Sequence, residues 1–209
     1  MLALVAVIQF GMGIEDRRQR ERDARRRLII TTARTLAEAE GWDAVTTRRL
    51  STEIEYSQPV LYKHFAGMEQ LVDAVAIDGF AELTDVTRDA RLQAGPPNDA
   101  LARVAHAYLD FARDNPAVYD AMFARATTLR FAAPDTPPQL TAAFAELRQA
   151  VDLADDAQDA DALTEVFWAA LHGLVTLGRT GRLRPGHDSD RLQLLVKQFT
   201  SRRGTGRSR

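Results

Sequence analysis

The sequence of 209 residues contains no cysteine, only four histidines and no long apolar run. Without cysteine there is no disulfide scaffold, no thiolate metal site and no thiol nucleophile, which fits a reducing compartment. No stretch reaches the roughly 20 consecutive apolar residues that a membrane-spanning helix needs. Apolar residues make up 45% of the chain and charged residues 27%, which excludes a wholly disordered protein. We therefore expect a globular, cytoplasmic protein with no membrane partner.

The motifs of common catalytic sites are also missing. There is no G-x-S-x-G nucleophile turn, no H-E-x-x-H metal-binding helix and no glycine-rich phosphate loop. The histidines are not spaced as a metal pair on one turn of a helix. The acidic run at residues 152–161 lacks the glycine and the terminal glutamate of a calcium loop, which favours a solvated loop. We expect no enzymatic activity, no metal and no other cofactor.

The net charge of −2 conceals an uneven distribution of charge along the chain. Residues 15–64 carry a net charge of +2, residues 65–196 carry −9 and residues 197–209 carry +5. Basic segments at both ends of an acidic body are typical of a chain in which one part binds nucleic acid.

The two ends of the chain lack a core-forming pattern. Residues 1–10 are apolar, but charges follow them instead of preceding them, which argues against a secretion signal. We expect Met12 to be the start and the extension 1–21 to be flexible. Residues 15–27 contain seven arginines and four acids, and two interpretations stay open: a solvated helix start, or an arm that contacts phosphates or the minor groove. We expect the basic tail 201–209 to be disordered.

Apolar residues recur at helical spacing through the rest of the chain, and no segment alternates as a strand would. The sequence therefore predicts an all-α fold. Helices are expected at 22–40, 47–55, 57–65, a long segment ending near residue 92, then 98–114, 116–129, 138–154, 161–178 and 188–200.

Residues 46–65 read as two short helices joined by a turn. Thr46, Thr47 and Ser57 are residue types that cap helix N-termini, and Pro59 is tolerated in a first turn. This arrangement is the form of a helix-turn-helix, whose second helix enters the major groove of DNA. A small helical hairpin with a solvated polar face is the alternative. The apolar residues that would pack the unit against the first helix are Leu50, Ile54, Val60, Leu61 and Phe65.

The side chains between these apolar positions form the predicted DNA-binding surface. Hydroxyls and helix N-termini suit phosphates, and Gln58 can hydrogen-bond an adenine edge while Pro59 and Val60 lie against a thymine methyl. The predicted DNA-binding residues are Thr46, Thr47, Arg48, Arg49, Ser57, Gln58, Pro59, Val60, Tyr62, Lys63 and His64.

Residues 50–75, LSTEIEYSQPVLYKHFAGMEQLVDAV, resemble the DNA-binding domain of TetR family transcriptional regulators, and S-x-x-x-L-Y-x-H-F is the most specific part. Residues 37–50, AEAEGWDAVTTRRL, match the same family in order and spacing. Trp168, His172 and Gly173, with Gly181-Arg-Leu, look like the C-terminal domain of one TetR subgroup.

The turn departs from the family pattern, because Glu55 and Tyr56 stand where the family usually has glycine and a small aliphatic residue. A glutamate in a left-handed turn position costs more than a glycine and adds negative charge near DNA.

The resemblance implies a DNA-binding domain at residues 22–66 and a larger ligand-binding and dimerisation domain at residues 67–200. It implies a homodimer that reads a near-palindromic operator on double-stranded DNA and, as a repressor, is released by a small-molecule effector. The alternative is a helical interaction module that no longer binds DNA specifically. Glu55 and the weak charge of residues 15–64 are the arguments for that alternative.

The last helices and the central helices supply two further sets of candidates. Apolar stripes at 161–178 and 188–200, doubled by a twofold axis, would form a four-helix dimer interface. Its predicted residues are Phe167, Ala170, Leu171, Leu174, Leu192, Leu195, Val196 and Phe199. Large or polar groups on otherwise apolar faces are the candidate contacts for a hydrophobic effector: His106, Tyr108, Tyr119, Met122, Phe123, Phe131, Trp168 and His172.

Overall fold

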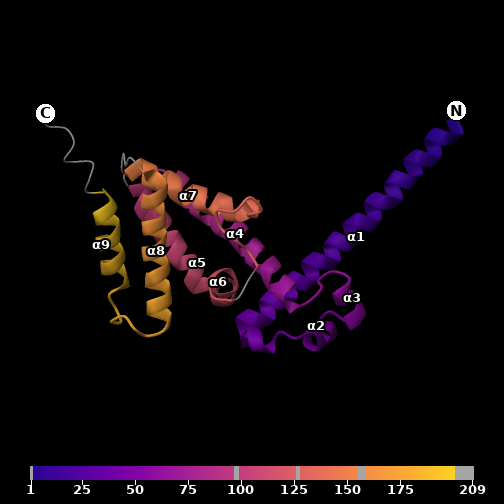
Figure 1. Ribbon diagram of the computed structural model, residues 1–209, viewed down its shortest axis with the longest axis horizontal. Helices are drawn as coiled ribbons and strands as arrows, with labels where there is room; N and C mark the ends of the chain where they lie inside the picture. The colour runs from indigo at the N-terminus through magenta and orange to yellow at the C-terminus, as the bar shows by residue number, and fades with distance from the viewer. Residues whose placement is uncertain (1, 97–98, 126–127, 155–158, 201–209) are drawn as a thin grey trace. The chain divides into compact units, whose positions relative to one another are not determined.

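The computed structural model describes residues 2–96, 99–125, 128–154 and 159–200, with side chains from residue 15 onward. Over these ranges the chain forms α-helices and one 3₁₀ turn and contains no strand, so the all-α prediction is confirmed (Figure 1). The chain divides into two compact units, residues 1–75 and 76–209. The tail 201–209, which we expected to be disordered, lies outside the described residues.

Helix α1 spans Leu2–Glu40 and therefore begins before the predicted start at residue 22. Within residues 15–27, arginine and glutamate are good helix formers, and pairs four residues apart add support. Arg17 Nε lies 3.3 Å from Glu21 Oε1, and Gln19 donates to Asp23 at 2.9 Å. Local pairing therefore extends the helix where no core is available.

The first unit continues from α1 into the helix-turn-helix. Gly41, with a φ of 83°, ends α1 and leads into the 3₁₀ turn Trp42–Ala44, then α2 (Thr47–Glu53) and α3 (Gln58–Tyr62) (Figure 1). The predicted core residues Leu50, Ile54, Leu61 and Phe65 are buried, together with Ile29, Ala33 and Leu36 of α1. Val60 is only half-buried.

The second unit is a bundle around α5, Ala100–Asp114, which contacts α6, α7, α8 and α9. Helix α4, Met68–Leu92, begins in the first unit and ends in the second. The remaining helices are α6 (Pro116–Phe123), α7 (Pro138–Ala154), α8 (Ala160–Arg179) and α9 (Asp188–Thr200). Among the described residues, no helix is both long and apolar enough to cross a membrane.

Two contacts fix α4 within this bundle. The carboxylate of Glu146 on α7 is only 6% exposed and receives Arg88 Nε at 2.9 Å and Arg91 Nη2 at 2.8 Å. Gly79 lies so close to α6 that a Cβ at this position would clash with Val118 and Met122. Helix α4 is therefore held by a buried ion pair on one neighbour and by close packing on another.

Candidate nucleic-acid interface and ligand cavity

The N-terminus of α2 is capped by a side chain, as the sequence predicts. Thr46 Oγ1 accepts a hydrogen bond of 3.1 Å from the backbone N–H of Arg49, and Thr46 itself is extended. Ser57 precedes α3 without capping it through its side chain, and Pro59 lies in the first turn of α3. The hydroxyl of Ser57 therefore stays available on the surface.

The turn between α2 and α3 closes in the way that a glycine normally permits. Glu55 has a φ of 55°, as the sequence comparison with glycine suggested. Its N–H donates to the carbonyl of Thr52 at 3.4 Å, and the N–H of Tyr56 donates to that of Ser51 at 3.1 Å. The turn thus keeps both hydrogen bonds of a helix C-terminus, at the cost of a strained glutamate.

The part of the predicted DNA-binding surface that lies on α3 is open to solvent. Gln58, Pro59, Tyr62 and Lys63 are exposed, and the ring of Tyr62 is 53% exposed. Within the described part of the chain, the side chains of Gln58, Tyr62 and Lys63 have no hydrogen-bond or ion-pair partner. Thr46, Arg48 and Ser57 are also exposed, while Thr47, Val60 and His64 are half-buried.

Arg49 differs from the other predicted donors because its guanidinium already has two partners. Its Nη2 lies 3.1 Å from Glu40 Oε1, and its Nε lies 2.9 Å from Glu53 Oε1. The first ion pair joins α2 to the end of α1, and the second lies within α2. A phosphate would have to compete with two carboxylates for Arg49, whereas Arg48 has no such partner among the described residues.

His64 lies beside the arginine-rich part of α1. Arg26 Nη1 donates to the carbonyl of His64 at 3.3 Å, and its guanidinium is 4.3 Å from the centre of the Phe65 ring. Burial, together with the positive charges of Arg22, Arg25 and Arg26, lowers the pKa of His64 below 6.5. The imidazole is therefore mainly neutral at pH 7.

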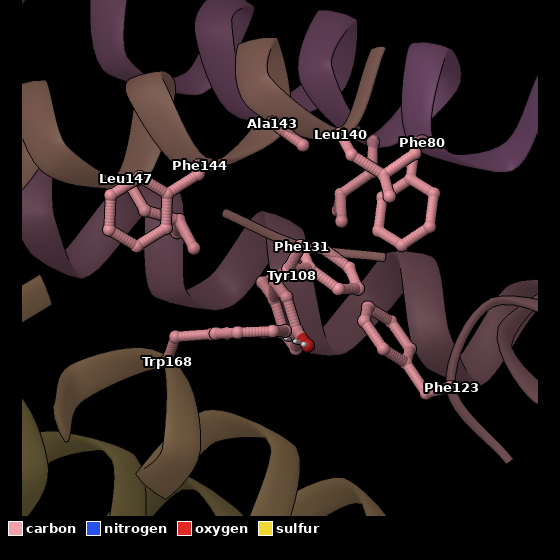
Figure 2. A pocket seen from close by; sticks show the side chains of 10 residues that line it. Phe80, Tyr108, Phe123, Phe131, Leu140, Ala143, Phe144, Leu147 and Trp168 are labelled. Carbon is pink, nitrogen blue, oxygen red and sulfur yellow. Dashed lines mark hydrogen bonds between the residues drawn. The ribbon is translucent and has the colours of Figure 1, made fainter. Parts of the chain in front are cut away.

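The second unit encloses a small apolar cavity of about 20 Å³, which is room for little more than one water molecule. Four predicted effector contacts line it, namely Tyr108, Phe123, Phe131 and Trp168, and their side chains converge in Figure 2. Sequence reasoning missed six others, because aliphatic and phenylalanine side chains on an apolar face look like any core residue. The six are Phe80, Leu83, Leu140, Ala143, Phe144 and Leu147.

A chain of hydrogen bonds leads away from the cavity. Trp168 Nε1 donates to the hydroxyl of Tyr108 at 3.2 Å (Figure 2). The Tyr108 hydroxyl is 2.9 Å from the hydroxyl of Tyr119. The Tyr119 hydroxyl is 2.8 Å from His172 Nδ1, and His172 Nε2 is 3.3 Å from Thr176 Oγ1. Three elements, α5, α6 and α8, are thereby joined through polar atoms.

Burial keeps the side chains of this hydrogen-bond chain uncharged. Desolvation raises the pKa of Tyr108 to about 12, despite hydrogen bonds from its neighbours that act in the opposite direction. Desolvation also raises the pKa of Tyr119, and it lowers the pKa of His172 below 6.5. At pH 7 the two tyrosines carry their protons and His172 is mainly a neutral imidazole.

Four predicted effector residues do not line the cavity. Tyr119 and His172 belong to the hydrogen-bond chain, and the other two lie elsewhere. Met122 is buried against Gly79, and His106 is exposed on α5 beside Leu192, Val196 and other residues of α9. His106 therefore belongs to a groove between α5 and α9 instead of to the cavity.

Half of the predicted dimer residues belong to the core of the second unit. Phe167, Leu171, Leu192 and Phe199 are buried within the chain, and the rings of Phe167 and Phe199 are 4.9 Å apart. Ala170, Leu174, Leu195 and Val196 are half-buried. The exposed apolar side chains of α8 and α9 are instead Val166 (60% exposed), Leu177 (39%) and Leu194 (61%).

Comparisons with known proteins cover both units. Residues 29–75 match the model of bacterial regulatory proteins of the tetR family, and residues 101–199 match the model of the tetracyclin repressor-like C-terminal domain. The chain is 32% identical over 162 residues to the uncharacterized HTH-type transcriptional regulator Rv0681 of Mycobacterium tuberculosis, covering 75% of this chain and 71% of that protein.

Solved structures share the fold. A protein of unknown function from Rhodococcus sp. RHA1 aligns with a TM-score of 0.67 and 26% identity, over 84% of this chain and 93% of that one. RolR in complex with resorcinol aligns with a TM-score of 0.61 and 16% identity, over 87% and 88%. The matches over both units and the relative in M. tuberculosis show that this chain belongs to the TetR family of DNA-binding transcriptional regulators, which are not enzymes.

Proposed function

We propose that the protein is a cytoplasmic repressor that binds a palindromic operator as a homodimer and releases it when a hydrophobic small molecule binds. The observation that carries the proposal is the pairing of two features in one chain. The first unit presents unpartnered donors on α3, and the second unit contains an aromatic cavity.

The exposed residues of α3 suit the major groove. Gln58 can form two hydrogen bonds to an adenine, and Lys63 can contact a phosphate beside the groove. Tyr62 offers a flat ring and a hydroxyl at the same surface. Two copies spaced by about one helical turn of DNA, roughly 34 Å, would read two half-sites on one face.

The arginine-rich part of α1 supports the interpretation of residues 15–27 as a phosphate-contacting element. Arg18, Arg22 and Arg25 follow one another at spacings of four and three residues, so they share one face of the helix. All three are exposed, and none has a carboxylate partner among the described residues. Arg22 and Arg25 lie close enough to His64 to influence its pKa, which places positive charge beside the end of α3.

Dimerisation is proposed through α8 and α9. Val166, Ala170, Gly173 and Leu177 recur on α8 at spacings of four, three and four residues and form one face. Val166 and Leu177 are exposed, and a Cβ at Gly173 would meet nothing within 4 Å. A second copy can approach this face closely and bury it, together with Leu194 of α9.

Effector release is proposed to act through α4 and α6. Phe80 and Phe123 line the cavity, and the adjacent Gly79 packs against α6 without space for a methyl group. A ligand that displaces these rings must shift α6 or α4, and α4 continues into the first unit. RolR, which shares this fold, has been solved with the phenol resorcinol.

Selection of bound duplexes from a random pool tests the proposed function. The expected result is an inverted repeat with half-sites about one helical turn apart, bound by two chains per duplex in sedimentation experiments. A selected sequence without symmetry, or a complex with one chain, would contradict the dimeric repressor. Repression is then measured with a reporter gene placed behind the selected sequence, whose expression is expected to fall when the protein is present.

A further inference from the structure

The cavity is nearly filled by one of its own side chains. Phe131 lies between α6 and α7, 40% of it is exposed, and its ring is 5.5 Å from that of Phe80 and 5.3 Å from that of Trp168 (Figure 2). Phe131 is thus partly exposed and lies between the buried ring of Phe80 and the half-buried ring of Trp168, so it can leave towards solvent with less loss of packing than Phe80. The space that it would leave matches one six-membered ring.

The polar atoms at the cavity are few. Of the residues that line it, only Tyr108 and Trp168 carry a polar side-chain atom, and none carries a charge. The N–H of Trp168 is already donated to Tyr108. The hydroxyl of Tyr108 therefore remains as the group on the wall that can form one more hydrogen bond.

The Tyr108 hydroxyl can accept two hydrogen bonds and donate one. In one arrangement Tyr108 donates to Tyr119, Tyr119 donates to His172 Nδ1, and Tyr108 keeps one lone pair for a ligand donor. In the reverse arrangement His172 Nδ1–H donates to Tyr119 and Tyr119 donates to Tyr108. The proton of Tyr108 is then free for a ligand acceptor. The distances of 2.9 and 2.8 Å allow both arrangements.

We propose that the effector is a neutral compound with a single six-membered aromatic ring and one hydroxyl or carbonyl group, which replaces the ring of Phe131 and hydrogen-bonds to Tyr108. This inference rests on the proposed effector function of the cavity. Anionic compounds are excluded because the cavity offers no cation, and an unpaired buried charge is costly. Arg179, whose guanidinium lies 5.9 Å from the centre of the Tyr119 ring, already pairs with Asp120 at 3.1 Å.

The class of polar group determines which nitrogen of His172 carries the proton. A carbonyl ligand requires the reverse arrangement, with the proton on Nδ1 and Nε2 accepting from Thr176. A hydroxyl that donates to Tyr108 requires the first arrangement, with the proton on Nε2. Because Thr176 is exposed on α8, the arrangement also changes which hydrogen bond this surface threonine makes.

Four probes of similar size test the ligand class on the full chain without DNA: toluene, phenol, acetophenone and benzoate. Calorimetry is expected to show phenol and acetophenone binding at least about a hundredfold more tightly than benzoate. Tyr108→Phe is expected to weaken both polar probes about tenfold and to leave toluene within about twofold. Tighter binding of benzoate, or equal loss of all probes in Tyr108→Phe, would overturn the proposal.

Nitrogen NMR of the His172 ring, with its signals assigned by comparison with His172→Gln, gives a second readout. These signals would not respond to the ligand if Tyr108 had only a structural role. With acetophenone bound, the ring proton is expected on Nδ1, and with phenol bound it is expected on Nε2. In Tyr119→Phe, both probes should still bind, but the protonated nitrogen should no longer differ between them. The same protonated nitrogen with both probes in the wild-type chain would contradict the hydrogen-bond chain.

Measuring DNA release with the same probes separates this inference from the proposed function. Phenol or acetophenone that binds with the expected ranking but leaves the operator complex intact contradicts effector release and supports the ligand class. A larger or anionic compound that binds in the cavity and releases DNA contradicts the ligand class and supports effector release.

Discussion

The polar side chains of α3 and those around the cavity differ in whether they have partners. Gln58 and Lys63 lie on the surface of the first unit without a partner among the described residues. In the second unit, Tyr108, Tyr119 and His172 are joined to one another, and Glu146 is joined to two arginines. A DNA duplex can thus meet α3 as it stands, whereas a ligand must rearrange contacts that already exist.

The same difference predicts what a substitution changes. A surface donor without partners contributes little to folding, so its removal is felt only when the partner molecule is present. A buried group with several partners contributes to folding in every state of the protein, because its loss leaves those partners unsatisfied.

The largest effect on stability is expected for Glu146→Gln. The substitution leaves Arg91, whose side chain is 14% exposed, without its carboxylate. We expect the free energy of unfolding to fall by about 2 to 3 kcal/mol, at the low end for a buried pair because Arg88 is partly solvated. Urea unfolding measures it, with the exposed Glu165→Gln as control. An equal, small loss of stability in both variants would contradict the expectation that a buried group with several partners contributes to folding and an exposed one does not.

For α3 we expect the reverse behaviour from Gln58→Ala and Lys63→Ala. Both variants should unfold like the wild type, within about 0.5 kcal/mol, because neither side chain has a partner. Gln58→Ala should cost about 2 kcal/mol of binding to the selected operator and relax preference at one base position. Lys63→Ala should weaken binding to all duplexes similarly.

Fluorescence anisotropy with matched and mismatched duplexes distinguishes these two roles, and the exposed Gln149→Ala serves as control. Identical behaviour of both variants on both duplexes would contradict the assignment of Gln58 to a base and of Lys63 to a phosphate.

Smaller changes in stability are expected at the residues that follow α2 and α8, and the two changes have opposite signs. A left-handed residue lies two positions beyond the end of both α2 and α8, Glu55 with a φ of 55° and Gly181 with a φ of 67°. Glu55→Gly is expected to raise the free energy of unfolding by about 1 kcal/mol, and Gly181→Ala to lower it by a similar amount. Thermal denaturation checks both variants, and a loss of stability in Glu55→Gly would show that the turn carries no strain.

The smallest effect is a pH dependence that arises from His172. Because burial holds the pKa of His172 below its unfolded value of 6.5, the unfolded chain takes up the proton first. The contribution of neutral His172 to the free energy of unfolding is complete above pH 6.5 and is lost as the pH falls towards the pKa of His172 in the folded chain. His172→Gln should flatten the unfolding free energy between pH 7 and 5.5, measured in urea. If the slope of the unfolding free energy against pH were unchanged in His172→Gln, another titratable group would have to cause the pH dependence.

The exposed face of the helix-turn-helix could be predicted from the sequence because the side chains that form it lie within twenty consecutive residues. The cap at Thr46 and the spacing of Leu50, Leu61 and Phe65 define that face locally. The cavity and its hydrogen-bond chain depend on Tyr108, Tyr119 and His172, which are 11 and 53 residues apart, so no local pattern pairs them.

Periodicity also cannot distinguish a core from an interface. Phe167 and Leu171 fall on an apolar stripe of α8 and were expected at a dimer contact, but they pack inside the chain. The neighbouring stripe through Val166 and Leu177 is the exposed one. The prediction also began the first helix only at residue 22, although a highly charged segment without a core, such as residues 15–21, can still form a helix through i,i+4 pairs.

The central claim is that the exposed face of α3 binds duplex DNA in the wide groove while the basic side chains around it contact phosphates. A fluorescence-anisotropy titration of the selected operator over a range of salt concentrations tests it most directly. We expect log K to fall linearly with log salt at a slope steeper than about −5, and the slope to become shallower by about 2 for a dimer of Lys63→Ala. A duplex that stays unbound in dilute buffer, or binding with no dependence on salt, would contradict the account.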